Sequence, residues 1–186
     1  MGKISPQKVS TKSGKEVLLR NPVAADAAAL IEFGKMSMSE TDCMVTLPEE
    51  FNMTLEEEIK FIERLADGPN SVAIVAECDG EIIGMIDFHG RTNRKRLNHV
   101  GFFGMAVYPK FRGDGVGAML ISAVLEWAKA HPTVRKVALS VFSTNTRAVN
   151  LYKRMGFVEE GRRIKEIQLS DGVFIDDLLM CKWIEK

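Results

Sequence analysis

The chain has 186 residues, 46% of them hydrophobic, and its 25 Lys and Arg residues balance 25 Asp and Glu residues. Length and apolar content favour one domain with a real core, while the balanced charge gives no field that would favour nucleic acid or an anionic membrane. The three cysteines, Cys43, Cys78 and Cys181, show no C-x-x-C spacing, so we expect neither a disulfide framework nor a metal site. The cysteines favour a reducing compartment, and there is no apolar run of 18 residues and no signal-peptide pattern, so the sequence predicts a cytoplasmic chain outside the membrane.

Strand and helix signals alternate along the chain. Residues 1–14 are rich in Lys, Ser, Thr and Gly, which predicts a loose N-terminal arm before a single domain over residues 15–186. The predicted elements are a strand at 17–20, a helix from Asp26 to about Met38, a helix behind the capping box Thr54-x-x-Glu57, strands at 71–78 and 81–89 joined by Asp79-Gly80, a strand at about 99–107, a helix from about Gly115, a strand at 137–142, a helix at 145–155 and two strands that meet at Asp171-Gly172.

The most informative segment is Arg112-Gly113-Asp114-Gly115-Val116-Gly117, between an apolar run and a helical pattern. Such a turn can bind phosphate, because unpaired N–H groups gather at a helix start and glycines let an anion approach. Ala118-Met119 follows where a nucleoside-triphosphate loop has Lys-Ser/Thr, and the glycine spacing does not fit the dinucleotide fingerprint. Two interpretations remain: a loop that binds a different phosphate-bearing ligand, or a glycine-rich turn without a ligand.

A second segment, Asn145 to Phe157, follows a strand-like run. Asn145 is a predicted N-cap, Gly156 is a predicted C′ glycine, and the apolar residues between them share one helical face. By itself this pattern predicts an amphipathic helix in which Tyr152 is a core residue.

Together the two segments resemble the GNAT superfamily of N-acetyltransferases. Ala106-Val107-Tyr108-Pro109 leads into Arg112-x-x-Gly115-x-Gly117, and Asn145-x-x-Ala148-x-x-Leu151-Tyr152 and Gly156-Phe157 follow. The end of the chain is similar to that of the bacterial ribosomal-protein-type and small-amine-type enzymes. The resemblance implies an α/β GNAT fold, with a mixed, strongly twisted central sheet of about six or seven strands and helices on both faces.

The resemblance also implies an N-acetyltransferase that uses acetyl-CoA as co-substrate and a primary amine as acceptor, by direct attack in a ternary complex. The loop N–H groups would hold the pyrophosphate, a strand edge would pair with the pantetheine and polarise the thioester carbonyl, and Asn145 would bind the cofactor arm. Asp114 is expected to point to solvent. The implied cofactor-binding residues are Met105, Ala106, Val107, Arg112, Gly113, Asp114, Gly115, Val116, Gly117, Ala118, Asn145 and Tyr152.

Tyr152 is the predicted catalytic residue. A phenol of pKa about 10 can donate a hydrogen bond or a proton to a departing thiolate of pKa near 8.5. The resemblance therefore implies that Tyr152 is the general acid.

The general base is the point where the resemblance fails. Many family members have a glutamate at positions that correspond to Gly101 and Ser140, neither of which accepts a proton at neutral pH. Asp87, His89, His99 and Glu166 are possible substitutes, although a lone histidine is more often structural. Deprotonating a lysine-type amine at pH 7 costs about 4.6 kcal/mol, against about 1.1 kcal/mol for an α-amine, so a missing base favours a peptide N-terminus or a small amino compound.

The acceptor pocket is expected between about residues 33–61 and 165–177. Met36, Met38, Met44 and Met53 could form an apolar wall or belong to the core. Glu40, Asp42, Glu49, Glu50 and the run Glu56-Glu57-Glu58 could attract a cation or form a solvated face. Of the adjacent Asp176 and Asp177, at most one faces the pocket.

Two other functions stay open: a module that senses acyl-CoA without turnover, and a structural domain without a ligand. A homodimer through the C-terminal strands is possible by resemblance, and the expected partner is an amine, either a small molecule or a peptide.

Overall fold

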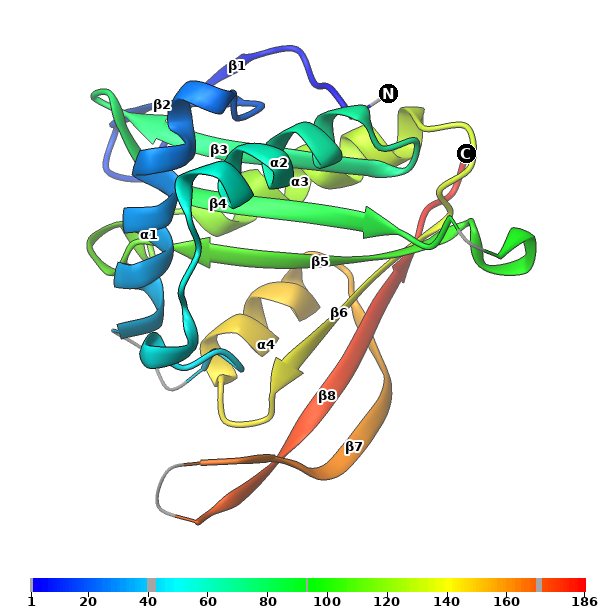
Figure 1. Ribbon diagram of the computed structural model, residues 1–186. Coiled ribbons are helices and arrows are strands. Elements are labelled where there is room, and N and C mark those ends of the chain that lie inside the picture. The colour runs from blue at the N-terminus through cyan, green and yellow to red at the C-terminus, as the bar shows by residue number, and fades with distance from the viewer. Residues whose placement is uncertain (1, 40–42, 93, 170–171) are drawn as a thin grey trace.

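The computed structural model describes residues 2–39, 43–92, 94–169 and 172–186, which form one eight-stranded sheet with helices packed against it (Figure 1). The strands are β1 (Gln7–Ser10), β2 (Glu16–Arg20), β3 (Ser71–Cys78), β4 (Glu81–Gly90), β5 (Val100–Val107), β6 (Lys136–Phe142), β7 (Val158–Gln168) and β8 (Phe174–Trp183). The α-helices are α1 (Ala27–Ser39), α2 (Leu55–Asp67), α3 (Val116–Ala130) and α4 (Thr146–Arg154). In these described ranges, no helix combines the length and apolar character that crossing a bilayer requires.

The strands lie in the order β1-β2-β3-β4-β5-β6-β8-β7. Among the described strands, β5 and β6 form the parallel pair and all other neighbours are antiparallel. The mixed α/β fold is as predicted, with eight strands where six or seven were expected. Figure 1 shows β7 and β8 as a long hairpin that extends beyond α4.

The additional strand, β1, corrects the prediction of a loose arm over residues 1–14. Gln7–Ser10 pairs with β2, and the Ile4 N–H donates to Asn21 Oδ1 at 2.8 Å. The segment QKVS holds one apolar residue, so its sequence carries almost no hydrophobic signal. Backbone pairing, which periodicity does not report, fixes it to the sheet.

Local signals fixed several element ends as predicted. Thr54 is the N-cap of α2, with its hydroxyl accepting from the Glu57 N–H while the Glu57 carboxylate accepts from the Thr54 N–H. Asp79 and Gly80 have φ values of 51° and 79° in the turn between β3 and β4, as a tight hairpin requires.

The helices cover both faces of the sheet. On β4, the Phe88 ring lies 5.3 Å from Trp127 of α3, while the next side chain, His89, lies 6.0 Å from Phe61 of α2. Because successive side chains of a strand point to opposite faces, α2 and α3 lie on opposite sides of the sheet. Phe103 of β5 pairs with Phe88 and contacts α4, so α4 shares the α3 side.

The parallel strands β5 and β6 separate soon after they meet. Their pairing runs from Val100–Lys136 to Phe102–Ala138, and beyond it residues 103–107 and 139–142 diverge. Figure 1 shows α3 following β5 and α4 following β6, so both helices begin near this opening. The divergence places strand ends, helix starts and a large cavity at one point of the fold.

Candidate active site

A cavity of about 1000 Å³ lies at the divergence of β5 and β6. Residues from both sequence motifs line it. From the first motif and the strand before it come Met105, Ala106, Val107, Arg112, Gly113, Gly115, Gly117 and Ala118, and from the second come Asn145, Thr146, Arg147, Ala148, Leu151 and Tyr152. Segments about 30 residues apart in sequence thus share one site, of a size that suits an extended ligand.

The glycine loop presents unpaired backbone donors to this cavity. Gly113 and Gly115 have φ values of 85° and 101°, which other L-residues rarely adopt. In the described part of the chain, no hydrogen bond uses the N–H groups of residues 113–118, whereas the next N–H, of Met119, donates to Gly115. Since unpaired donors at a helix start bind anions, the loop is suited to bind a phosphate group.

Gly117 keeps α3 and α4 close together at this cavity. A Cβ added to it would lie 3.2 Å from Leu151 Cδ2 and 3.4 Å from Met105 Cε. A larger residue would displace these two side chains, which line the cavity, by at least a few tenths of an ångström.

Arg112 and Asn145 stabilise the two helix starts. The Arg112 Nε donates to the Val107 carbonyl at 2.9 Å, which ties the loop to the end of β5. Asn145 Oδ1 accepts from the Ala148 N–H at 3.2 Å as the N-cap of α4, so its NH₂ group is the part suited to donate to a ligand.

The Tyr152 ring packs in the core while also lining the cavity. It is 7% exposed, and its centroid lies 5.8 Å from Phe103 and 6.0 Å from Phe157. Burial raises the pKa of Tyr152 to about 12, so the phenol stays protonated through the physiological range. No hydrogen bond within the described residues engages its hydroxyl, which leaves that group able to donate to a ligand.

Asp114 and Val116 differ from the other predicted site residues, since neither side chain lines the cavity. Asp114 is partly exposed, and at the surface its carboxylate accepts from the N–H and hydroxyl of Ser13, at 2.8 and 2.6 Å. These bonds lower the pKa of Asp114. Val116 is buried at 1% exposure, so its backbone alone can belong to the loop's donor set.

The structure explains the missing glutamate at Gly101. A Cβ there would lie 2.2 Å from Phe88 Cζ and 2.7 Å from the His89 carbonyl oxygen. Packing of Phe88 therefore excludes every side chain at this position. Ser140, the other position, is exposed and lines the cavity.

The four substitute bases do not line the cavity. His99 lies at the far end of β5, with its ring 6.0 Å from Trp183, and Glu166 is exposed on β7. Asp87 comes nearest, since a Cβ on Gly104, which lines the cavity, would lie 3.5 Å from Asp87 Oδ1. Asp87 also accepts a hydrogen bond from His89 Nε2 at 2.6 Å.

Asp177 is a buried carboxylate in the cavity wall. It is 4% exposed and pairs across the sheet with Phe142, so it shares a face with that residue and with Ser140. Arg163 donates to its Oδ2 at 3.1 Å. The neighbouring Asp176 points the other way, to Arg162 and the Lys165 N–H, so one of the two aspartates faces the pocket, as predicted.

Ser37 of α1 was not predicted from the sequence. It is 2% exposed, lines the cavity, and its Oγ has no hydrogen-bond partner in the described chain. A buried hydroxyl without a partner is unusual, and it marks a place where a ligand could supply one. A serine in an apolar helix carries no signal that would have identified it.

Of the other residues predicted for the acceptor pocket, some line the cavity and some do not. Met44 lines the cavity together with Cys43, Val45 and Thr46, whereas Met36, Met38 and Met53 are not among the lining residues. Glu40 and Asp42 lie outside the described residues, as does Asp171 of the predicted last turn.

Comparison with known proteins identifies the family. The model of the acetyltransferase (GNAT) family matches residues 38–157. The chain is similar to the L-amino acid N-acetyltransferase AaaT of Escherichia coli (32% identity; 64% of this chain, 73% of the relative) and to an N-alpha-acetyltransferase of Sulfurisphaera tokodaii (31% identity; 80% and 84%).

Solved structures give the same result. An acetyltransferase of the GNAT family from Streptococcus pneumoniae superimposes with a TM-score of 0.87 at 31% identity, over 91% of this chain and all of the other. A phosphinothricin acetyltransferase from Sinorhizobium meliloti, solved in complex with acetyl-CoA, shares the fold with a TM-score of 0.79 at 20% identity, over 90% of this chain and 88% of the other. The cavity, its glycine loop and these matches agree: the chain belongs to the GNAT family of acetyltransferases, whose co-substrate is acetyl-CoA.

Proposed function

We propose that the chain transfers an acetyl group from acetyl-CoA to a primary amine, with a peptide N-terminus or a small amino compound as the favoured acceptor. The observation that carries the proposal is the single cavity between β5 and β6, which joins the unpaired N–H groups of the glycine loop to the Tyr152 phenol. Acetyl-CoA supplies the acetyl group as a thioester, and the amine attacks its carbonyl carbon directly.

Different residues along the cavity bind different parts of acetyl-CoA. The N–H groups of residues 113–118 bind the pyrophosphate, with Arg112 fixing the loop. The unpaired part of β5, Met105–Val107, offers backbone groups to the pantetheine and a donor to the thioester carbonyl. The Asn145 NH₂ group donates from the α4 side.

Tyr152 acts on the departing sulfur. With its pKa raised to about 12 by burial, the phenol keeps its proton at neutral pH and is a hydrogen-bond donor to the thiolate as the C–S bond breaks. Its ring is held by Phe103 and Phe157, so the hydroxyl points from a rigid position.

The acceptor amine enters from the face that carries Asp177, Ser140 and Ser37. Among the described residues that line the cavity, Asp177 is the carboxylate, and it can attract an ammonium group and orient the amine. No glutamate occupies the usual base positions, which supports an acceptor that is partly neutral at pH 7. The names of the two relatives, an L-amino acid N-acetyltransferase and an N-alpha-acetyltransferase, also support an α-amine.

The test measures CoA release from acetyl-CoA with a panel of N-terminal peptides, lysine peptides, polyamines and free amino acids, and identifies each product by mass. We expect α-acetylated products. Acetylation confined to lysine side chains would contradict the acceptor class. Binding of acetyl-CoA without any product would instead favour a non-catalytic acyl-CoA sensor. The absence of a glutamate at Gly101 and Ser140 favours that alternative.

Asp177→Asn tests the acceptor site within that enzyme. The change is expected to raise KM for the amine at least fivefold while Kd for acetyl-CoA stays within about twofold, since a charged hydrogen-bond partner is worth about 1.5–3 kcal/mol. Asp176→Asn is the matched control, because it makes the same change on the opposite face of β8. Equal rises of KM in both variants would assign the effect to the hairpin and not to amine binding.

A further inference from the structure

The turn between β1 and β2 packs against the glycine loop. The Lys12 N–H donates to the Asp114 carbonyl at 3.0 Å, and Ser13 donates twice to the Asp114 carboxylate. Two segments 101 residues apart in sequence are thus joined by three hydrogen bonds. The turn therefore forms a second wall beside the phosphate loop.

The turn is itself well ordered by its own hydrogen bonds. The Thr11 N–H donates to the Lys15 carbonyl at 2.9 Å, and the Gly14 N–H donates to the Thr11 carbonyl at 3.0 Å. Thr11 is 5% exposed, and Gly14 takes the positive φ of 87° that reverses the chain. These bonds, together with the bond from the Lys12 N–H to Asp114, attach the backbone of Lys12 to the loop.

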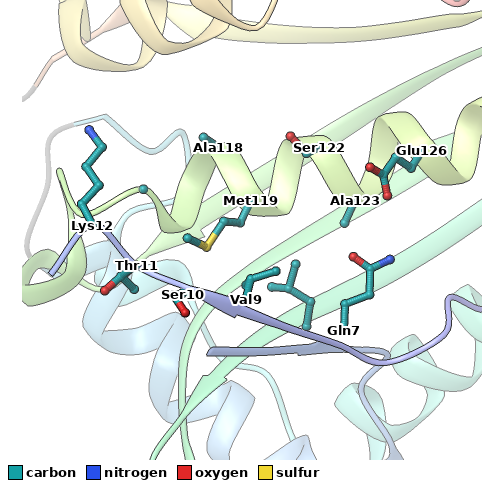
Figure 2. Close-up of a pocket in the computed structure, with 12 residues that line it drawn as sticks. Gln7, Val9, Ser10, Thr11, Lys12, Ala118, Met119, Ser122, Ala123 and Glu126 are labelled. Carbon is teal, nitrogen blue, oxygen red and sulfur yellow. The ribbon is translucent and has the colours of Figure 1, made fainter. Parts of the chain in front are cut away.

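The Lys12 side chain lies beside the start of α3. It lines the large cavity and also a second one of about 420 Å³ between β1 and α3, and Figure 2 shows it extended from the turn that follows β1, near the start of the helix. A Cβ on Gly115 would lie 3.8 Å from Lys12 Cγ. No described residue forms a hydrogen bond or ion pair with its ammonium group.

Charge around the loop is arranged to favour a phosphate. The Asp114 carboxylate is the anion at the loop, and Ser13 holds it on the side of the turn, outside the lining of the large cavity, while Glu126 lines the smaller cavity further along α3. An unpaired ammonium group and unpaired N–H groups remain on the cavity side. Charge-assisted contacts between Lys and phosphate are among the stronger polar interactions in proteins.

We propose that Lys12 binds a phosphate group of acetyl-CoA, so that the β1–β2 turn and the glycine loop form two sides of one phosphate-binding site. This inference rests on the proposed cofactor site. Two phosphates of the same molecule fit the position: the pyrophosphate at the loop, and the 3′-phosphate in or near the smaller cavity, whose lining includes Ser122 and Gln7 (Figure 2).

The test compares Kd for acetyl-CoA by calorimetry in the wild type, Lys12→Ala and Lys12→Arg. We expect Lys12→Ala to weaken binding about tenfold and Lys12→Arg to keep most of the affinity, because one hydrogen bond to a charged group is lost or retained. Lys8→Ala is the matched control: it removes the same charge from β1, where Lys8 forms an exposed ion pair with Glu16, and should change Kd less than twofold.

A second ligand, acetyl-dephospho-CoA, identifies the phosphate. If the 3′-phosphate is bound, the Lys12→Ala effect disappears with this ligand, and if the pyrophosphate is bound, the effect persists; both results support the inference. Equal Kd for wild type and Lys12→Ala with intact acetyl-CoA would overturn it and leave the proposed function in place. No binding by the wild type would overturn the proposed function, and this inference with it.

Discussion

Replacing Tyr152 by phenylalanine separates the chemical role of this residue from its structural one. The change removes one oxygen and keeps the ring that packs against Phe103 and Phe157 at 5.8 and 6.0 Å. Because no described residue bonds to the hydroxyl, its loss leaves no buried partner unsatisfied. We therefore expect the free energy of unfolding to change by less than about 0.5 kcal/mol.

The expected loss of turnover follows from the hydrogen bond that we propose between the phenol and the leaving sulfur. A hydrogen bond to a charged group contributes about 1.5–3 kcal/mol, which corresponds to roughly 10- to 150-fold in rate. Since Tyr152 does not act on the phosphates, Kd for acetyl-CoA should stay within about twofold. The expected signature is a lower kcat at unchanged co-substrate affinity.

The assay is CoA release at saturating acetyl-CoA between pH 6 and pH 10. Burial raises the pKa of Tyr152 to about 12, so its ionisation should not reduce kcat anywhere in this range. Tyr108→Phe is the control, because it removes the hydroxyl of the other tyrosine, which does not line the cavity. Unchanged kcat in Tyr152→Phe, or an alkaline decline in the wild type that Tyr152→Phe abolishes, would refute the assigned role or its pKa.

Three further changes test the structure. Gly101→Ala should lower the free energy of unfolding in urea by about 1–3 kcal/mol, because its Cβ would meet Phe88 at 2.2 Å. Asp26→Asn should cost about 1–3 kcal/mol at pH 7 by weakening the two bonds from Arg20. Arg20 lowers the pKa of Asp26, so the stabilisation by this pair is present above about pH 4 and is lost as the pH falls further. The thermal unfolding temperatures of variant and wild type should therefore become equal in acid. Ser37→Ala should leave stability unchanged or higher and raise KM for an amine that uses the hydroxyl, whereas an unchanged KM would exclude this contact.

The parts of the fold that sequence predicts are those fixed by neighbouring residues. The capping box at Thr54 and the turn at Asp79-Gly80 act within three or four residues, and both stand where the sequence places them. The glycine loop belongs to the same class, because the positive φ values at Gly113 and Gly115 are local requirements.

The parts that sequence does not predict depend on partners far along the chain. β1 exists because β2 pairs with it, and the Asp114 carboxylate is held at the surface by Ser13, which lies 101 residues away in sequence. Ser37 enters the site from α1, and no spacing in the sequence connects it with the motifs; for Asp176 and Asp177 the sequence predicts that at most one faces the pocket but does not say which. The two motifs supply the side of the cavity that we propose for acetyl-CoA, while the proposed acceptor side is assembled from single residues.

The absence of a dedicated base in the described cavity wall affects which amine the site can use. Packing against Phe88 removes any side chain at Gly101, and Asp177 is held by Arg163, so a strong dedicated base is absent from the described cavity wall. An amine of pKa about 10.4 would then lose about 4.6 kcal/mol to deprotonation at pH 7, and an α-amine of pKa about 7.8 only about 1.1 kcal/mol. The difference of about 3.5 kcal/mol is several hundredfold in rate, enough to set acceptor preference without any specific contact. Measured with matched peptides, kcat/KM for lysine should therefore approach that for the α-amine as pH rises from 7 to 10, and a ratio independent of pH would show that a base on the protein, such as Asp87, removes the proton.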